Sequence, residues 1–210
     1  MSRFKDLILS ANVVFWDFDG VIKRSNLVKN NAFYSLFEDI SEVQRDYILN
    51  HHIEHQGLSR FKKIPHYLQY LNKELNKENI DNYLDRFSRL VLDGVIESDY
   101  VEGVLDILPK AKKSVLVTAT PKDEIKIILK KLKISKYFSK VYGSPKTKIE
   151  CLEDYSKQYG IVPNKCVFVG DSKSDLDCAR HHKIEIVFVR NEYNHHIRLS
   201  EKVIQIDNFL

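Results

Sequence analysis

The sequence has few cysteines and no long apolar run, and each shortage excludes a class of protein. Its three cysteines, Cys151, Cys166 and Cys178, are an odd number without a CxxC pair. We therefore expect reduced thiols, and neither a disulfide framework nor a zinc site. No segment reaches the roughly 20 apolar residues that a membrane helix needs, and none before Asp17 resembles a signal peptide. These observations favour a cytoplasmic protein.

The sequence also lacks a strong excess of one charge. Lys and Arg total 33 against 29 for Asp and Glu, which gives a formal net charge of +4. The basic residues are scattered along the chain, which is typical of a solvated surface and not of a nucleic-acid interface. The 210 residues suffice for one medium domain, or for a core domain that carries a smaller insert.

Short apolar runs predict the strands of a sheet. The run 13–16 ends abruptly at Asp17, as a strand buried on both faces of a parallel sheet does. Similar runs follow much later in the chain, at 114–117, 166–169 and 184–189. Helical patterns lie between them, at 121–132, 148–159 and 174–182. Strands that alternate with helices predict an α/β fold with a doubly wound parallel sheet.

The stretch between the first two predicted strands has a different texture. From residue 26 to 97 there is almost no strand pattern. Helical periodicity recurs there, near 26–38, 41–55, 60–76 and 80–95. A strand followed by helices before the sheet resumes predicts an inserted all-helical domain. We place this domain at residues 24–98, with 1–23 and 99–210 forming the α/β core.

The ends of the predicted strands carry acidic residues. Asp17 and Asp19 follow the first strand, and Asp171 and Asp175 follow the strand at 166–169. Ligands of an open α/β sheet bind beyond the carboxyl ends of its strands. Carboxylates within about 5 Å of one another would repel by roughly 3 kcal/mol per pair at an effective dielectric constant near 20, and a cation removes that cost. Oxygen ligands without His or Cys favour a hard ion, and Mg²⁺ is the usual partner of phosphate chemistry.

Two further residues suit the binding of a phosphate. Thr118 ends the second predicted strand, where its hydroxyl and the neighbouring backbone N–H groups can donate to phosphate oxygens. Lys148 opens a predicted helix and can neutralise both a nucleophile and a phosphate. Lys146 lies nearby and remains an alternative. We favour Lys148 because it leads directly into the helix.

Four segments resemble, in order, the motifs of the haloacid dehalogenase superfamily. They are DFDGV at 17–21, the apolar strand VLVT at 115–118, the helix-opening lysine of KIECL at 148–152, and GDSKSD at 170–175. Because their order and spacing and the helical insert all agree, the resemblance covers essentially the whole chain. The structural alternative is a receiver-like sheet whose acidic residues only receive signals. A receiver would not need the long helical insert.

The resemblance implies a role for each acidic residue. Asp17 is the nucleophile that attacks phosphorus and forms an aspartyl-phosphate. Asp19 is the general acid for the leaving oxygen and then the base that activates water. Mg²⁺ is held by Asp17, the backbone carbonyl of Asp19 and Asp171, while Asp175 orients or supplements these ligands. Together with the catalytic residues Thr118 and Lys148, the residue after the second motif, Ala119, binds the phosphoryl group.

The insert resembles the helical cap of phosphoglycolate phosphatase and β-phosphoglucomutase relatives. Such a cap closes over the site, excludes water and carries substrate selectivity. The segment GLSR at 57–60 resembles their cap loop, in which the arginine reaches the polar end of the substrate. Arg60 and Lys63 are therefore candidates for binding an anionic or polyol group. For Arg60, a surface arginine at a helix start is an equally open interpretation.

The favoured function is a magnesium-dependent phosphatase for a small phosphomonoester of a sugar, polyol or short organic acid. The partner is then a small phosphorylated metabolite, with no nucleic acid or membrane, and the protein a monomer or homodimer. Two alternatives stay open. A phosphosugar mutase would use the same residues, and a non-catalytic binding module could occupy the same fold.

Overall fold

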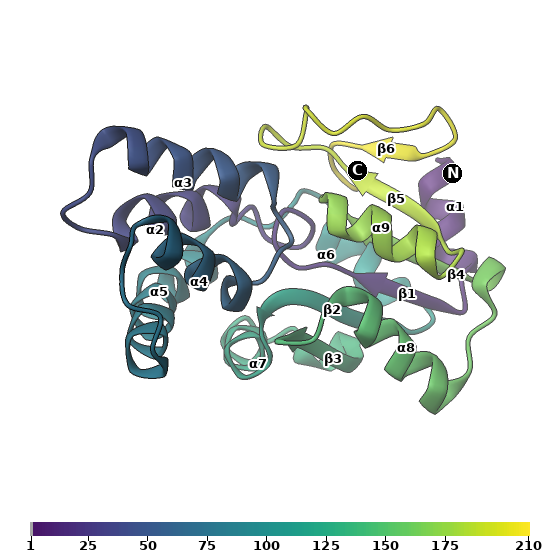
Figure 1. The fold of residues 1–210 in the computed structure, drawn as a ribbon. Helices are drawn as coiled ribbons and strands as arrows, with labels where there is room; N and C mark the ends of the chain where they lie inside the picture. Colours follow the sequence, from purple (N-terminus) through teal and green to yellow (C-terminus); the bar gives the residue numbers. More distant parts are fainter. Residues whose placement is uncertain (1) are drawn as a thin grey trace.

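The computed structural model describes residues 2–210 and contains a six-stranded sheet with helices on both faces (Figure 1). All strand pairs are parallel, and the order is β3-β2-β1-β4-β5-β6. The strands are β1 (Val13–Trp16), β2 (Ser114–Pro121), β3 (Phe138–Ser144), β4 (Cys166–Gly170), β5 (Glu185–Val189) and β6 (Ile204–Ile206). The predicted α/β fold with a doubly wound parallel sheet is confirmed.

The strand order puts a switch point between β1 and β4. The chain winds from β1 through β2 to β3, then crosses back to β4 and continues in the other direction. A crevice opens at such a point, beyond the carboxyl ends of the two central strands. Trp16 pairs with Val169, and the Asp17 N–H donates to the Val169 carbonyl at 2.9 Å. Asp17 and Asp171 therefore leave neighbouring strands at the same edge of the sheet.

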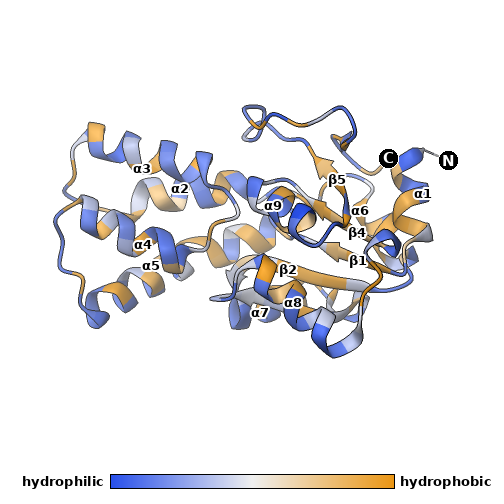
Figure 2. Ribbon diagram, turned by 45° about the vertical axis from the view of Figure 1, so that its right-hand side comes forward, coloured by the Kyte–Doolittle hydropathy of each residue, from blue (hydrophilic) through white to orange (hydrophobic). Residues whose placement is uncertain are grey.

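Successive side chains of a strand point to opposite faces of the sheet, so the sheet packs against an apolar layer on each face. Val14 and Trp16 of β1 join the layer under α1 (Arg3–Ser10), α6 (Val104–Ile107) and α7 (Lys122–Lys131). Val13 and Phe15 join the opposite layer, under α8 (Lys148–Tyr159) and α9 (Lys173–His181). Figure 2 shows the resulting concentration of hydrophobic residues in β1, β2 and β4. Both faces of β1 are covered, so its sequence is apolar throughout.

Four helices form a separate bundle beyond the sheet (Figure 1). They are α2 (Asn26–Leu36), α3 (Glu42–Glu54), α4 (Arg60–Tyr70) and α5 (Lys77–Glu97). Aromatic rings fill the middle of the bundle; for example, Phe33 lies 4.2 Å from Phe87 between ring centroids. The two connections to the sheet run side by side, since Lys23 bridges to Tyr100 and the Arg24 N–H donates to the Asp99 carbonyl at 2.8 Å. We propose that this bundle is a cap domain with limits near residues 24 and 98.

Some elements differ from the sequence-based predictions. Helix α4 ends at Tyr70 and not at residue 76, and α1, β3 and β6 were not predicted. β3 and β6 are the two edge strands. Apart from the buried last three residues of β3, their residues are half-buried or exposed. An edge strand needs no continuous apolar run, so the pattern that revealed β1 and β4 is missing from these two.

The three cysteines, Cys151, Cys166 and Cys178, are buried free thiols, and each belongs to the apolar layer beneath α8 and α9. They therefore act as small core residues.

Within residues 2–210, no helix combines the length and the apolar character needed to cross a bilayer.

The C-terminal Phe209 provides a test of how the last segment is anchored. It is 2% exposed, with its ring 6.3 Å from Phe4 and 5.9 Å from Trp16. Phe209→Ala should lower the free energy of unfolding by about 3–5 kcal/mol in urea titrations, because it leaves a cavity against these rings. Leu210→Ala is the control, since Leu210 is 70% exposed. An equal loss in the two variants would contradict this anchoring role.

Candidate active site

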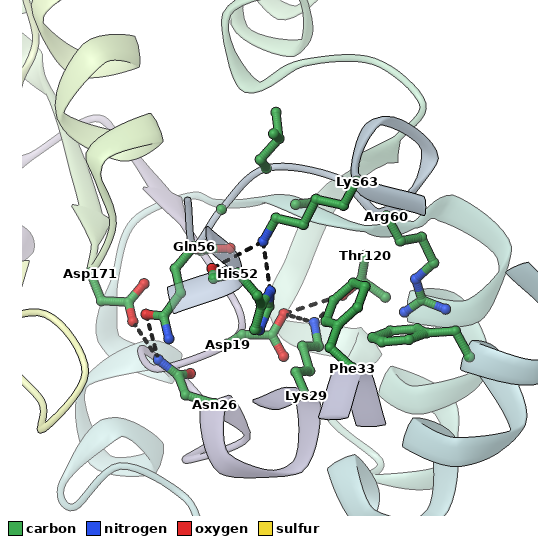
Figure 3. A pocket seen from close by; sticks show the side chains of 15 residues that line it. Asp19, Asn26, Lys29, Phe33, His52, Gln56, Arg60, Lys63, Thr120 and Asp171 are labelled. Atoms are coloured by element: carbon green, nitrogen blue, oxygen red, sulfur yellow. Dashed lines mark hydrogen bonds and ion pairs between the residues drawn. The ribbon is translucent and has the colours of Figure 1, made fainter. Parts of the chain in front are cut away.

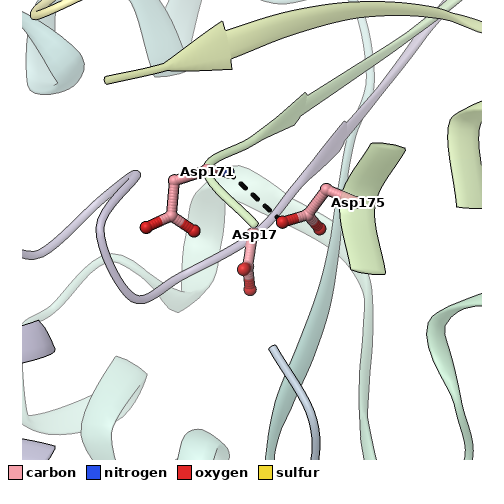
Figure 4. A group of neighbouring side chains, drawn as sticks. All are labelled: Asp17, Asp171 and Asp175. Carbon is pink, nitrogen blue, oxygen red and sulfur yellow. Dashed lines mark hydrogen bonds between the residues drawn. The ribbon is translucent and has the colours of Figure 1, made fainter. Parts of the chain in front are cut away.

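Three buried carboxylates meet at the switch point (Figure 4). Asp17 follows β1, Asp171 follows β4 and Asp175 lies in the first turn of α9; they offer oxygens that lie within 4.8 Å of one another. The turn after β1 makes this approach possible, because Gly20 adopts φ +75° and a Cβ there would lie 1.9 Å from Asp171 Oδ2. Only glycine suits both the backbone angle and the space.

Lys148 reaches the carboxylates from the first residue of α8. Its Nζ lies 2.6 Å from Asp17 Oδ2 and 2.5 Å from Asp175 Oδ1. Thr147 is the N-cap of this helix and forms a capping box with Glu150, which fixes the start of α8 at Lys148. Lys146 is exposed and pairs with Asp154 instead. The structure therefore places Lys148, and not Lys146, beside Asp17.

Asp175 and Asp171 differ in how many of their carboxylate oxygens accept hydrogen bonds. Asp175 Oδ2 accepts from the backbone N–H groups of Asp171 (3.2 Å) and Ser172 (3.0 Å) and from Ser172 Oγ (2.6 Å). Asp171 Oδ2 accepts from the amides of Asn26 at 3.0 Å and Asn191 at 2.8 Å. With Oδ1 also bound to Lys148, Asp175 is suited to orienting the loop and the lysine. Asp17 and Asp171 are better placed to hold an ion directly.

The electrostatics of this cluster favour a cation. Burial raises the pKa of Asp17 to about 7, although Lys148 opposes the shift. Burial, followed by the charges of Asp17 and Asp175, raises the pKa of Asp171 well above its usual range. For Lys148, burial lowers the pKa, but the two neighbouring carboxylates outweigh it and leave the pKa raised. Three acids thus share one lysine, and a divalent ion would remove the excess negative charge.

The donor set fits Mg²⁺. The available ligand atoms beside Asp17 and Asp171 are oxygens, which a small hard cation prefers. Next to them, Asn26 donates to Asp171 through its amide nitrogen, while its Oδ1 is buried and has no hydrogen-bond partner within the described chain. An orphaned buried oxygen at this point suits the water molecules that Mg²⁺ retains.

Asp19 lies across the crevice from the three-acid group, and its carboxylate does not belong to it. It accepts hydrogen bonds from Ser25 Oγ at 2.6 Å and Thr120 Oγ1 at 3.2 Å, and it pairs with Lys29 of α2. Burial by itself would raise the pKa of Asp19, but Lys29 and these hydrogen bonds bring it below its usual value. The Asp19 carboxylate is thus occupied by other partners, and the expected contribution of its backbone carbonyl to the ion stays a prediction.

A cavity of about 60 Å³ connects Asp17, Asp19 and Asp171 with the helical bundle (Figure 3). Its walls include Phe33 and Lys63 from the bundle, and Ala119 and Thr120 from the sheet domain. Within the described chain, Thr118 is not part of this lining; it is 1% exposed, and its Oγ1 accepts from the Thr120 N–H at 3.2 Å. Lys148 faces an adjoining cavity of about 180 Å³ that shares Ala119 with the first. Of the phosphate-binding candidates, Ala119 and Lys148 line these cavities, whereas Thr118 lines neither of them.

Arg60 lines the cavity, but its charge is already neutralised. Its guanidinium contacts the Glu124 carboxylate at 2.7 and 2.8 Å, donates to Ser88 Oγ at 2.8 Å and lies 4.4 Å from the Phe87 ring. The side chain is 5% exposed, so the surface-arginine interpretation is wrong. Because Glu124 belongs to α7 of the sheet domain, the ion pair joins the bundle to the sheet. Gly57, just before α4, approaches the sheet domain at a second place, since a Cβ there would lie 2.2 Å from Ser174 Oγ of α9.

Sequence reasoning missed several polar residues at the site. Lys29 and Asn26 are three residues apart on α2 and both face the carboxylates, a spacing that puts side chains on one helix face. Asn191 and Asn194 come just after β5, and Asn194 Nδ2 donates to the Asp171 carbonyl at 2.8 Å. Their position beyond a strand end was the available signal, because that edge of the sheet carries the site.

The comparisons with known proteins agree with this geometry. Residues 14–189 match the model of the haloacid dehalogenase-like hydrolase family. The chain belongs to this family. A phosphoglycolate phosphatase of Colwellia psychrerythraea is 28% identical over 131 residues, which cover 60% of this chain and 58% of that protein. The chain thus spans little more than half the length of this curated relative.

Two solved structures share the fold. A β-phosphoglucomutase of Clostridium difficile superposes with a TM-score of 0.72 at 21% identity, covering 95% of this chain and 92% of its own. A mutant of CbbY from Rhodobacter sphaeroides, in complex with xylulose-(1,5)bisphosphate, has a TM-score of 0.76 at 13% identity and 95% coverage of both chains. At these identities the likeness establishes the fold alone.

The Arg60–Glu124 ion pair predicts an energetic coupling between bundle and sheet. In a double-mutant cycle with Arg60→Met and Glu124→Gln, urea unfolding should give a coupling free energy of about 1–3 kcal/mol, because the pair is bidentate and buried. The control cycle uses Lys77→Met and Asp81→Asn, whose side chains are 90% and 50% exposed. That exposed pair should show no measurable coupling. Equal results for the two cycles would contradict a role of Arg60 in docking.

Proposed function

We propose that the protein is a magnesium-dependent phosphatase that hydrolyses a small phosphomonoester through an aspartyl-phosphate on Asp17. The observation that supports this most directly is the setting of Asp17. One of its oxygens accepts from the Phe18 N–H at 2.7 Å and the other from Lys148 at 2.6 Å, within reach of the Asp171 and Asp175 carboxylates. An anionic phosphate is repelled by the carboxylate that must attack it. Positive charge beside Asp17, from Lys148 and from the proposed metal, would lower this repulsion.

The proposed chemistry divides among a few residues. An Asp17 oxygen bonds to phosphorus while the ester bond from phosphorus to the leaving oxygen breaks. Asp19 must first be protonated, because despite its burial Lys29 holds its pKa below the usual value; it then gives that oxygen a proton, and later takes one from the water that hydrolyses the acyl phosphate. Lys148, Thr118 and the backbone around Ala119 hold the phosphoryl oxygens. Asp17, the Asp19 carbonyl and Asp171 would hold Mg²⁺, which would neutralise charge on the phosphoryl group.

The substrate class follows from the cavity and from the relatives. We infer a small phosphomonoester of a sugar, polyol or short organic acid, bound under the helical cap that carries Arg60 and Lys63. The relative named phosphoglycolate phosphatase favours the last of these classes. A phosphosugar mutase would employ the same acids and lysine, but it would return the phosphoryl group to a sugar instead of releasing it to water.

The direct test is phosphate release from a panel of phosphorylated metabolites with Mg²⁺ present. Asp17→Asn should reduce turnover by about 10³-fold or more while the protein stays folded, because the amide cannot attack phosphorus. Isomerised sugar phosphate without free phosphate would identify a mutase. Full activity of Asp17→Asn on p-nitrophenyl phosphate would rule out the proposed nucleophile.

Two lysines only two residues apart supply a matched control. Lys148→Met should abolish phosphate release, and Lys146→Met should leave it close to wild type, since Lys146 pairs with Asp154 away from Asp17. A melting curve checks that each variant is folded. A comparable loss in both variants would count against the assigned role of Lys148.

Metal binding predicts a change in stability as well as in activity. EDTA should abolish turnover and Mg²⁺ should restore it. Mg²⁺ at about 100 times its Kd should also raise Tm by roughly 5–10 °C, because it relieves the repulsion among the buried acids. Asp171→Asn should lose this shift, whereas Asp123→Asn, at a 94% exposed site, should keep it. A shift that survives in Asp171→Asn would place the ion elsewhere.

A further inference from the structure

Lys63 differs from the other basic residues of the cavity wall because it has no acidic partner. Lys29 pairs with Asp19 and Arg60 pairs with Glu124. Lys63 is 1% exposed; among the described residues its Nζ hydrogen-bonds only with His52, at 2.7 Å to Nδ1 and 3.3 Å to the carbonyl oxygen, and lies 5.6 Å from the centre of the Phe33 ring. Throughout residues 2–210, no carboxylate oxygen lies within 4 Å of this amine.

This arrangement leaves a buried amine incompletely satisfied. Burial lowers the pKa of Lys63 well below its usual value, and the nearby charge of Lys29 lowers it further. A lysine ammonium has three donors and no acceptor, and His52 accounts for two of them. The third donor has no partner in the described chain. An unpaired buried cation is unfavourable, and an anion that enters the cavity would remove the penalty.

His52 holds the amine in place. It is 5% exposed, and its ring lies 4.4 Å from that of Phe33 between centroids. Burial, followed by the charge of Lys63, lowers the pKa of His52 well below its usual value, so the neutral ring can accept at Nδ1. Lys63 is a long side chain that would otherwise extend toward solvent. Figure 3 shows its amine directed inward, toward His52.

The charges of the cavity wall limit what the anion can be. Lys63 and Asp17 line the same cavity, so a substrate group that reaches Lys63 lies near the phosphoryl group. Lys29 and Arg60 are already paired with carboxylates, and Lys63 has one donor left. A carboxylate with one negative charge matches this single donor better than a phosphate with nearly two charges does.

We propose that Lys63, positioned by His52, binds a carboxylate of the substrate and thereby selects short phosphorylated acids over neutral phosphomonoesters. The proposal rests on the phosphatase activity inferred above and narrows its substrate class. It assigns selectivity to Lys63 and not to Arg60, because Glu124 already neutralises Arg60. The amine of Lys63, which has no acidic partner within the described chain, then gains a counter-ion from the substrate.

The first measurement uses the unaltered protein and three ligands. 2-Phosphoglycolate carries a carboxylate, 2-phosphoglycolamide replaces it by a neutral amide of the same size, and ethylene glycol bisphosphate carries a second phosphate. With Mg²⁺ present, KM for the carboxylate should be about 10- to 100-fold below that for the amide, which is the worth of one charge-assisted hydrogen bond. Equal KM values, or a lower KM for the bisphosphate, would overturn the proposal.

The second measurement uses Lys63→Met, which keeps the length of the side chain but removes its charge. KM for 2-phosphoglycolate should rise about 10- to 100-fold with a smaller change in kcat, while KM for the amide should change less than about threefold. The control is Lys77→Met, on the exposed surface of α5, which should alter neither value. Parallel increases for carboxylate and amide would mean that Lys63 only supports the structure, and would overturn the proposal.

Binding separates this proposal from the activity on which it rests. In Asp17→Asn with Mg²⁺, calorimetry should show tighter binding of 2-phosphoglycolate than of its amide, and adding Lys63→Met should remove the difference. If the wild-type protein releases no phosphate from any compound, the proposed phosphatase function fails. The calorimetric preference still decides the role of Lys63: its presence supports the carboxylate site and its absence overturns it.

Discussion

The active site depends on the burial of three carboxylates around a single lysine at the switch point of the sheet. Asp17, Asp171 and Asp175 are each less than 4% exposed, and Lys148 binds two of them directly. Buried like charges are unstable without compensation. The lysine and the backbone N–H groups that bind Asp175 provide part of it, and the proposed hard cation would provide the rest. The neighbouring asparagines and Gly20 then serve to hold these groups at short distance.

The helical bundle extends this electrostatic site instead of merely covering it. Asn26 and Lys29 of α2 reach Asp171 and Asp19, respectively. Arg60 of α4 reaches Glu124 on the sheet domain. Each contact crosses from the bundle to the sheet domain, so the position of the bundle and the charge distribution at the carboxylates are linked. If the bundle acts as the proposed cap, its opening would leave Asp19 without its lysine and Arg60 without its carboxylate.

Most of the site near Asp17 could be predicted from the sequence because its residues follow apolar strands. Asp17 and Asp171 come immediately after β1 and β4, and parallel strands bring their carboxyl ends to one edge. The preference for Lys148 over Lys146 followed from the start of α8 in the same way. The edge strands β3 and β6 escaped prediction, since a strand with one open edge needs no continuous apolar run.

Local patterns of apolar and polar residues specify the parallel sheet, the helical insert and the residues at the strand ends. Which cations remain free depends on contacts between distant parts of the chain. Arg60 and Lys63 look equivalent in a helical sequence, three residues apart. The fold places Glu124 against the first and His52 against the second. The availability of a charge depends on partners that are distant in the chain, and local periodicity carries no information about them.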